Sequence, residues 1–201
     1  MGRVTSQHVL KGYSPVWLAL VNSEQWDGFG HLTDHLENPV WLKTFLRRAG
    51  LASLAEGPVP EEDLRRLRAR LRRVVETVAT GKRLSPAECA GLDAWLAQGA
   101  QRRFLSAHGG GYRISWEPLK GGWPWILAMI AASAAETLAE GDLRRVKVCP
   151  NAGCRWAFYD QTHGNRRRWC NDRACGNRDK VRRFRARQTR TDGTGSRTSP
   201  P

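Results

Sequence analysis

Apolar residues recur at helical intervals along most of the first 145 positions. Between residues 61 and 80 they recur every three or four residues, which places them on one face of a long helix. They are Leu64, Leu67, Leu71, Val74, Val75 and Val78. The later segment PWILAMIAASAAETLAE, residues 124–140, is apolar almost all round. That pattern predicts a buried central helix, because it leaves no polar face to turn toward water.

Capping residues delimit two further helices. Asn38 and Pro39 precede VWLKTFLRRA and Gly50 follows it, so a helix is expected between them. The run Ser85-Pro86-Ala87-Glu88 combines a capping box with proline at the first helical position, which predicts a helix reaching about Gln98. Cys89 lies in that helix, and we expect it to be a small buried apolar residue.

A glycine turn and a polar tail complete the pattern. In RRFLSAHGGGYRISWEPL the residues Tyr112, Ile114 and Trp116 alternate with polar ones, which predicts a short β-hairpin. The last residues, TDGTGSRTSPP (191–201), are polar and contain Gly, Ser and Pro, as is typical of a disordered tail. The hydrophobic pattern therefore indicates a mainly α N-terminal domain with a short β-hairpin.

Charge is distributed unevenly along the chain. The formal net charge is +14, and residues 144–190 hold 15 Lys or Arg against three acids, a net +12. Such a local basic excess indicates a polyanionic partner, nucleic acid first and an anionic membrane surface second. The helix expected over residues 61–80 is also rich in arginine, but there a solvated helix face is the better interpretation. Its arginines are Arg65, Arg66, Arg68, Arg70, Arg72 and Arg73.

Membrane and secretory segments are not predicted. No apolar run approaches the roughly 20 residues that span a bilayer, and the N-terminal apolar run is short and lacks a cleavage site. We therefore expect a cytoplasmic protein with no membrane partner. In that compartment cysteine clusters hold metal more often than they form disulfides.

Four cysteines form two pairs of equal spacing. Cys149 and Cys154 are separated by four residues, as are Cys170 and Cys175, and fifteen residues lie between the pairs. This arrangement predicts one structural Zn²⁺ held by four thiolates, with no open position for catalysis. Two disulfides, or a redox sensor built on the same thiolates, are the alternatives. His163 could replace one cysteine, although a surface position in a turn is favoured.

The segment around the cysteines suggests a small ribbon. PNAG can form a knuckle, RWAFYD and NRRRW can form two strands with THGN turning between them, and a helix follows Asn171. The expected module is a treble-clef-like zinc ribbon of knuckle, β-hairpin and basic helix. Four aromatic residues can cover the metal: Trp156, Phe158, Tyr159 and Trp169.

The arginines of the second strand and of the final helix are the candidate nucleic-acid contacts. Guanidinium groups bind phosphate and also read guanine edges, so duplex DNA is favoured, with RNA as the alternative. The candidates are Arg166, Arg167, Arg168, Arg178, Lys180, Arg182, Arg183, Arg185 and Arg187. Gly176 and Asn177 are expected to brace the zinc site and the helix start.

These motifs resemble a known pair of domains. The run Cys175-Gly176-Asn177-Arg178, with NRRRWC (165–170) and CPNAGCRWAFYD, resembles the CGNR zinc finger of bacterial proteins. The N-terminal part is similar to the ABATE domain found upstream of that finger. The supporting residues are LALVNS (18–23), Asp34 with Pro39, LRRAGL (46–51) and WPW (123–125). The resemblance implies a stress-linked bacterial transcription regulator whose zinc module binds DNA.

Three segments are predicted from these observations: a helical ABATE-like domain over 1–143, a CGNR-type finger over 144–190, and the tail. The helical domain would sense a small-molecule ligand or form a homodimer. Its tryptophans could line a ligand pocket or fill the core. An enzyme is not expected, because no nucleophile elbow, phosphate loop or zinc-protease spacing occurs. The cluster of His31, Asp34, His35 and Glu37 is interpreted as capping and surface residues.

Overall fold

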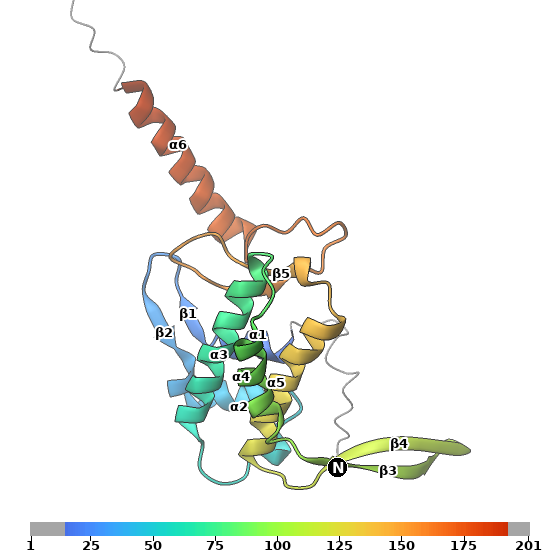
Figure 1. The fold of residues 1–201 in the computed structure, drawn as a ribbon. Helices are drawn as coiled ribbons and strands as arrows, with labels where there is room; N and C mark the ends of the chain where they lie inside the picture. Colours follow the sequence, from blue (N-terminus) through green and yellow to red (C-terminus); the bar gives the residue numbers. More distant parts are fainter. Residues whose placement is uncertain (1–14, 193–201) are drawn as a thin grey trace, which may run out of the picture.

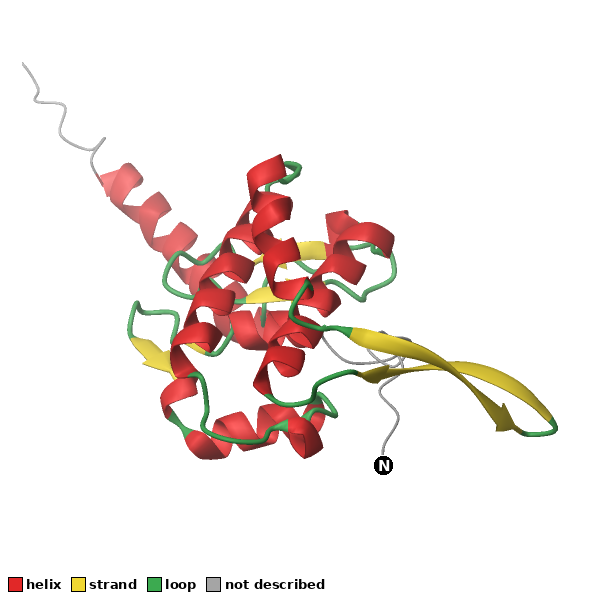
Figure 2. Ribbon diagram, turned by 60° about the horizontal axis from the view of Figure 1, so that its bottom comes forward, coloured by secondary structure: helices red, strands yellow, loops and turns green. Residues whose placement is uncertain are grey.

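A computed structural model of the chain describes residues 15–192 (Figure 1). Five helices form the body: α1 Val16–Val21, α2 Pro39–Arg48, α3 Glu61–Ala79, α4 Pro86–Leu96 and α5 Trp123–Glu140. Three antiparallel strand pairs accompany them: β1 Glu24–Trp26 with β2 Leu32–Asp34, β3 Gln101–His108 with β4 Gly111–Pro118, and β5 Val146–Val148 with β6 Ala157–Tyr159. The sixth helix, α6 Asn177–Asp192, extends away from the body (Figures 1 and 2).

The core lies where α1, α3 and α5 meet. The six predicted apolar residues of α3 are all buried, and so are Ile126 and Ile130 of α5. Trp17 in α1 is 1% exposed and donates a hydrogen bond from Nε1 to Thr137 Oγ1 at 3.0 Å. Trp123 and Trp125 are buried as well. These tryptophans therefore fill the interior, which is the second of the two interpretations left open by the sequence.

The helix starts agree with their capping signals. Asn38 Oδ1 accepts from the backbone N–H of Val40 at 3.0 Å. In the capping box the Ser85 hydroxyl accepts from Glu88 N at 3.3 Å, and the Glu88 carboxylate accepts from Ser85 N at 2.8 Å. The prediction for Cys89 is wrong, because its side chain is exposed. Within α4 the buried residue is Leu92, one turn further along the helix.

The β3–β4 hairpin is longer than predicted and projects from the body at the end opposite to α6 (Figures 1 and 2). Leu105 pairs with Ile114, and both are 65% exposed. Tyr112, two residues before Ile114, is 81% exposed. Since alternate residues of a strand share a face, the hairpin has one apolar face turned to solvent.

Two arginines of α3 depart from the predicted solvated face. Arg68 is 8% exposed and Arg72 is 7% exposed. Arg68 forms a bidentate ion pair with Asp34, at 2.5 Å and 2.7 Å. Arg72 donates to the backbone carbonyls of Val21 and Arg155, at 2.9 Å and 2.8 Å. The periodicity of the apolar residues could not reveal this, because the partners come from distant parts of the chain.

Candidate metal centre and nucleic-acid interface

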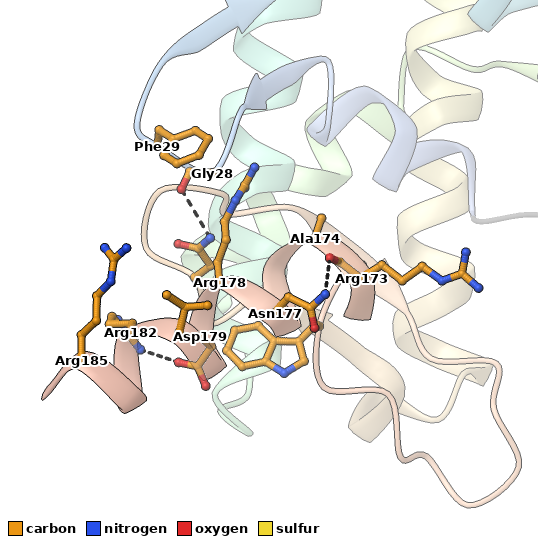
Figure 3. A pocket seen from close by; sticks show the side chains of 12 residues that line it. Gly28, Phe29, Arg173, Ala174, Asn177, Arg178, Asp179, Arg182 and Arg185 are labelled. Carbon is orange, nitrogen blue, oxygen red and sulfur yellow. Dashed lines mark hydrogen bonds and ion pairs between the residues drawn. The ribbon is translucent and has the colours of Figure 1, made fainter. Parts of the chain in front are cut away.

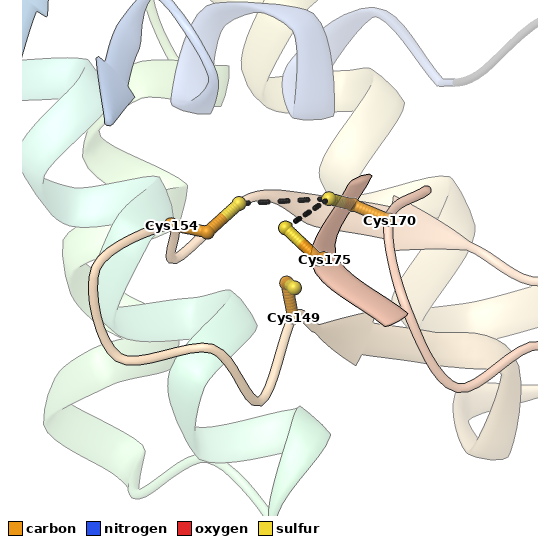
Figure 4. Close-up of side chains that lie close together, drawn as sticks. All are labelled: Cys149, Cys154, Cys170 and Cys175. Atoms are coloured by element: carbon orange, nitrogen blue, oxygen red, sulfur yellow. Dashed lines mark hydrogen bonds between the residues drawn. The ribbon is translucent and has the colours of Figure 1, made fainter. Parts of the chain in front are cut away.

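Four sulfurs gather at one point between the knuckle and the start of α6. The Sγ atoms of Cys149, Cys154, Cys170 and Cys175 all lie within 4.8 Å of one another (Figure 4). The Cys154–Cys170 sulfurs are 3.5 Å apart and the Cys170–Cys175 sulfurs are 3.6 Å apart. Three of these cysteines are buried and Cys170 is half-buried. The fifth cysteine, Cys89, lies outside this cluster.

The cluster fits a tetrahedral zinc ion. Four sulfurs at about 2.3 Å from a central zinc lie about 3.8 Å from one another, close to the separations found here. Hydrogen bonds from the Cys154 and Cys170 thiols lower the pKa of Cys149, and the pKa values of Cys154 and Cys170 are raised in turn. Four thiolates at such separations repel one another, so complete deprotonation requires a cation between them.

The knuckle is shaped by its own short-range hydrogen bonds. Asn151 Oδ1 accepts from Gly153 N at 3.1 Å, and Asn151 O accepts from Cys154 N at 2.8 Å. Asn151 Nδ2 lies 3.7 Å from Cys175 Sγ, which links the first pair of cysteines to the second. The motif PNAG therefore turns the chain so that Cys149 and Cys154 face one centre.

The strand pair beside the cluster differs from the predicted one. β6, within RWAFYD, pairs with β5 before the knuckle, and NRRRW is not a strand. The turn THGN lies within the loop that follows β6. This loop is held by Asp160, whose side chain is fully buried and accepts from Lys147 Nζ at 2.7 Å and from Arg167 N at 2.7 Å. The backbone N–H of Arg167, in the middle of NRRRW, is therefore bonded to this carboxylate instead of to a neighbouring strand.

Asp160 remains ionised inside the protein. Burial would raise its pKa, but hydrogen bonds from Lys147, from Thr162 and from the backbone of Arg167 outweigh that effect and hold the pKa well below its usual value. Lys147 Nζ also donates to the carbonyls of Asn165 and Arg167, at 2.9 Å and 2.7 Å. One buried ion pair thus fixes the whole loop that leads to Cys170. In the sequence, the only signal for Asp160 is that it is one of three acids in the basic segment 144–190.

A π-helical turn, Asp172–Gly176, presents Cys175 and leads into α6. Asn171 caps it by accepting from Arg173 N and Ala174 N at 2.9 Å and 3.1 Å. A side chain on Gly176 would place its Cβ 3.2 Å from Trp169 Cδ1, so glycine suits this close contact. Asn177 Nδ2 donates to Arg173 O at 2.9 Å. These two residues therefore contact the turn that carries the fourth cysteine.

Three of the four aromatic residues expected to cover the metal divide between two environments, and the fourth, Phe158, is buried under the Arg167 guanidinium. Trp169, which is 8% exposed, and Trp156 pack against the cysteines. Tyr159 packs instead against the main core, together with Val148, and Val146 and Ala157 of the β5–β6 pair are part of that core. Asn22 holds Ala157 through two hydrogen bonds, of 2.7 Å and 2.8 Å. The cysteine cluster is therefore covered by two tryptophans, while its strand pair belongs to the helical body.

The candidate basic residues are not equivalent. Residues 180–188 of α6 are all exposed, which includes Lys180, Arg182, Arg183, Arg185 and Arg187. Arg182 and Arg183 contact Asp179 at 2.7 Å and 2.8 Å, yet remain 70% and 54% exposed. Arg166 and Arg168 are exposed in the loop before Cys170. These seven basic side chains are therefore accessible to a polyanion.

Arg167 and Arg178 make contacts inside the protein. Arg167 donates from Nε to Trp169 O at 3.0 Å and from Nη2 to Cys170 O, and its guanidinium lies 4.5 Å from the centroid of the Phe158 ring. Arg178 donates to Asp27 O at 2.9 Å, and its guanidinium lies 4.3 Å from the centroid of Phe29. Both are half-buried. We interpret them as bracing residues first, and Arg178 also lines a groove together with Arg182 and Arg185 (Figure 3).

Fold and site together define a helical protein with a C-terminal four-cysteine zinc finger. Residues 14–141 match the family model ABATE, described as "Putative stress-induced transcription regulator", and residues 145–188 match the CGNR zinc finger. The chain therefore belongs to the ABATE family, and its finger of four clustered cysteines indicates one Zn²⁺ cofactor. A search of curated proteins found no match. Both resemblances inferred from the sequence motifs are thus confirmed.

None of the helices within residues 15–192 is both long and apolar enough to cross a membrane. In the cluster of His31, Asp34, His35 and Glu37, the side chains contact different partners. Asp34 caps the turn His35–Glu37 and pairs with Arg68, whereas His31 contacts Asp27 at 2.8 Å. His163 lies in an exposed turn, and the four-sulfur cluster is complete without it.

Proposed function

We propose that this protein is a DNA-binding transcription regulator whose finger contacts duplex DNA. The four ligands of its zinc are Cys149, Cys154, Cys170 and Cys175. The single observation that carries the proposal is the position of α6, which starts at the zinc cluster and extends away from the body with residues 180–188 exposed. A polar helix of this length is marginal alone in water, and phosphate groups along its sides would stabilise it.

Zinc has a structural role in this proposal. Four thiolates complete the tetrahedron, so the ion would cross-link the knuckle to the π-helical turn without an open coordination position. The finger would then be a rigid base that fixes the direction of α6. In this proposal the chain is a cytoplasmic binding protein and not an enzyme. The helical domain would sense a ligand or mediate homodimer formation.

The accessible basic residues supply the affinity. Arg166 and Arg168 of the loop and the five exposed basic residues within 180–188 of α6 would contact phosphates, and each contact releases counterions. We expect the logarithm of the affinity to fall linearly with the logarithm of the salt concentration, with a slope of about −0.9 for each phosphate neutralised. Six contacts would weaken binding on the order of a thousandfold between low and moderate salt.

The test is a titration of the zinc-loaded protein with fluorescent duplex DNA at several salt concentrations, beside a Cys170→Ser variant. A selection from fragmented genomic DNA follows at physiological salt. Enrichment of a few sites, lost in Cys170→Ser, supports a sequence-specific regulator. If duplex DNA is not bound while single-stranded RNA is, the RNA-binding alternative replaces the proposal.

A further inference from the structure

A loop of the helical domain lies against the start of α6. Residues 27–31 connect β1 to β2 and contact both the knuckle and the finger helix (Figure 3). Gly28 N donates to Gly153 O at 2.9 Å, and Arg178 donates to Asp27 O at 2.9 Å. This loop and the finger are more than 100 residues apart in the sequence, so the contact is a product of the fold.

The contact depends on two glycines. A Cβ on Gly28 would lie 1.7 Å from Arg178 Nη1, and Gly28 has a φ of +91°. A Cβ on Gly153 would lie 2.9 Å from Gly28 O and 3.1 Å from Gly30 N, both backbone atoms. Any side chain at Gly153 would therefore push the loop away from the knuckle. The approach is close because both positions lack a side chain.

Asp27 fixes the tip of the loop. Its Oδ1 accepts from the backbone N–H of Phe29 at 2.6 Å and of His31 at 3.2 Å. The hydrogen bond from the His31 side chain, followed by that from Phe29 N, lowers the pKa of Asp27 to about 2. Asp27 is thus an ionised acceptor at neutral pH and holds a turn of the type that Asp residues favour.

Phe29 stands at the tip of this ordered loop with its ring in solvent. It is 73% exposed, although the Arg178 guanidinium lies 4.3 Å from its centroid. Single exposed apolar residues are common on protein surfaces. Phe29 differs from these because its backbone is bonded in place and a cation stacks on its ring. It also lines a groove of about 660 Å³ together with Arg173, Arg182 and Arg185.

We propose that Phe29 is part of the DNA-binding face, where it contacts duplex DNA beside the start of α6. The groove joins this aromatic residue to four arginines and one acid, Asp179. This charge pattern is complementary to a polyanion with apolar base and sugar edges between its phosphates. Proteins that bend DNA use Phe as an apolar wedge against base steps. Arg178 is the positioning residue, since it holds both the loop backbone and the ring. This inference rests on the proposed function.

The helical domain would thereby contribute directly to DNA binding. The β1–β2 pair is continuous with the buried Asp34–Arg68 ion pair, because Asp34 is the last residue of β2. A movement of the Asp34–Arg68 pair would therefore be transmitted to Phe29 through the backbone of residues 29–34. The interface is composite, with phosphate contacts from the finger and one apolar contact from the loop.

The experiment compares Phe29→Ala with Tyr112→Ala in the full zinc-loaded chain. Tyr112 is a matched control, because it is an exposed aromatic on the hairpin at the opposite end of the body. Duplex DNA binding is measured at several salt concentrations. We expect Phe29→Ala to bind about tenfold more weakly with an unchanged salt slope, because the lost contact carries no charge. Tyr112→Ala should bind like the unmodified protein, and Phe29→Tyr should retain most of the affinity.

The outcomes separate the two proposals. If the unmodified protein fails to bind duplex DNA, the proposed function is overturned. If it binds and Phe29→Ala matches Tyr112→Ala within twofold, only the role of Phe29 is overturned. If Phe29→Ala weakens binding to single-stranded probes but not to duplex DNA, the proposed contact of Phe29 with duplex DNA is also overturned. Thermal melting of each variant distinguishes a lost contact from a misfolded loop, and we expect equal melting temperatures because Phe29 is exposed.

Discussion

Two helices of this molecule are rich in arginine, and their surroundings give them different roles. α3 holds six arginines, but eight of its residues are buried, including Arg68 and Arg72. In α6 residues 180–188 are exposed throughout, and even Val181 and Phe184 are 48% and 60% exposed. α3 crosses the core, whereas α6 extends beyond the body (Figure 1). Arginine content alone therefore does not indicate a nucleic-acid surface.

The partners of each arginine explain the difference. Four of the six in α3 contact carboxylates or carbonyls of the same chain. Arg65 and Arg66 bond Glu61 and Glu62, at 3.1 Å and 3.0 Å, and Arg68 and Arg72 have the buried partners described above. α6 offers its arginines one buried acid, Asp179. An excess of positive charge at an exposed helix is stabilised by an external anion. The following predictions test this contrast, beginning with the largest effect.

Removal of zinc should have the largest effect. Structural zinc sites contribute apparent binding free energies of about 10–16 kcal/mol, and here the ion would connect the knuckle to the turn before α6. We expect a chelator to abolish DNA binding and to reduce the helical circular dichroism signal by the contribution of α6. The helices of the body should persist, because Val146 and Ala157 anchor the strand pair in the main core.

The control for zinc removal is Cys89→Ser, which should retain the metal because Cys89 is exposed in α4, outside the cluster. Loss of the entire helical signal in a single step on chelation would show that the metal also supports the helical body. In that case α3 and α6 would depend on the same centre, and the contrast between them would be weaker.

Arg68→Ala should be the most destabilising change in α3. It leaves the Asp34 carboxylate, which is 18% exposed, without its main partner, and breaking a buried pair costs about 3–5 kcal/mol. Urea denaturation measures this. Arg66→Ala is the control within the same helix, and it should cost less than about 1 kcal/mol because Arg66 is 66% exposed. Equal costs would contradict the assignment of a buried pair.

The same ion pair predicts a pH dependence. The hydrogen bonds from Arg68 hold the pKa of Asp34 below its usual value. The stabilisation is therefore fully present above the unfolded pKa of about 4 and is lost as the pH falls through the lower folded value. Denaturation midpoints measured from pH 6 down to 3 should fall more steeply for the unmodified protein than for Arg68→Ala.

Arg167 and Arg168 are neighbours with opposite roles. Arg167→Ala removes hydrogen bonds to the carbonyls of Trp169 and Cys170, so we expect a loss of about 1–3 kcal/mol and faster zinc release to a chelator. Arg168→Ala should leave zinc release unchanged and reduce the salt slope of DNA binding by about one. Zinc release is followed with a colorimetric indicator. Similar zinc release from both variants would contradict the bracing role of Arg167.

The smallest effects should come from single exposed charges. Lys180→Ala in α6 should weaken DNA binding a few-fold and reduce the salt slope by about one. Arg73→Ala in α3 is also exposed but lies on a helix that packs into the body, and it should leave both quantities unchanged. Anisotropy titrations at several salt concentrations suffice. An equal effect of the two would extend the DNA-binding face to α3.

Local signals in the sequence were sufficient for the helices and for the cysteines. The capping residues Asn38 and Ser85 act within three or four positions of themselves, and the four cysteines have a spacing that few other sites share. The pairing of β6 with β5 was missed because VKV is short and lies before the knuckle. The buried Asp160 carboxylate binds Lys147 Nζ and Arg167 N, and these contacts hold residues 160–167 as a loop. Strand propensity cannot predict contacts of this kind.

Other features depended wholly on tertiary structure. The inward direction of Arg68 and Arg72 follows from Asp34, Val21 and Arg155, which no periodicity connects to α3. The approach of the β1–β2 loop to the finger joins residues over 120 positions apart. The partners in these cases are a carboxylate, two backbone carbonyls and a glycine, and only the fold places them next to their counterparts.

The close backbone contact between Gly28 and Gly153 also bears on how such proteins can be recombined. A finger transplanted to another scaffold would keep its cysteines, but its knuckle would lack the matching loop. Conversely, a foreign finger with a larger residue in place of Gly153 could not seat on this body, since the first added carbon would meet Gly28 O at 2.9 Å. The finger therefore cannot be exchanged between proteins independently of the helical domain. Engineered chimeras should carry the β1–β2 loop and the knuckle together.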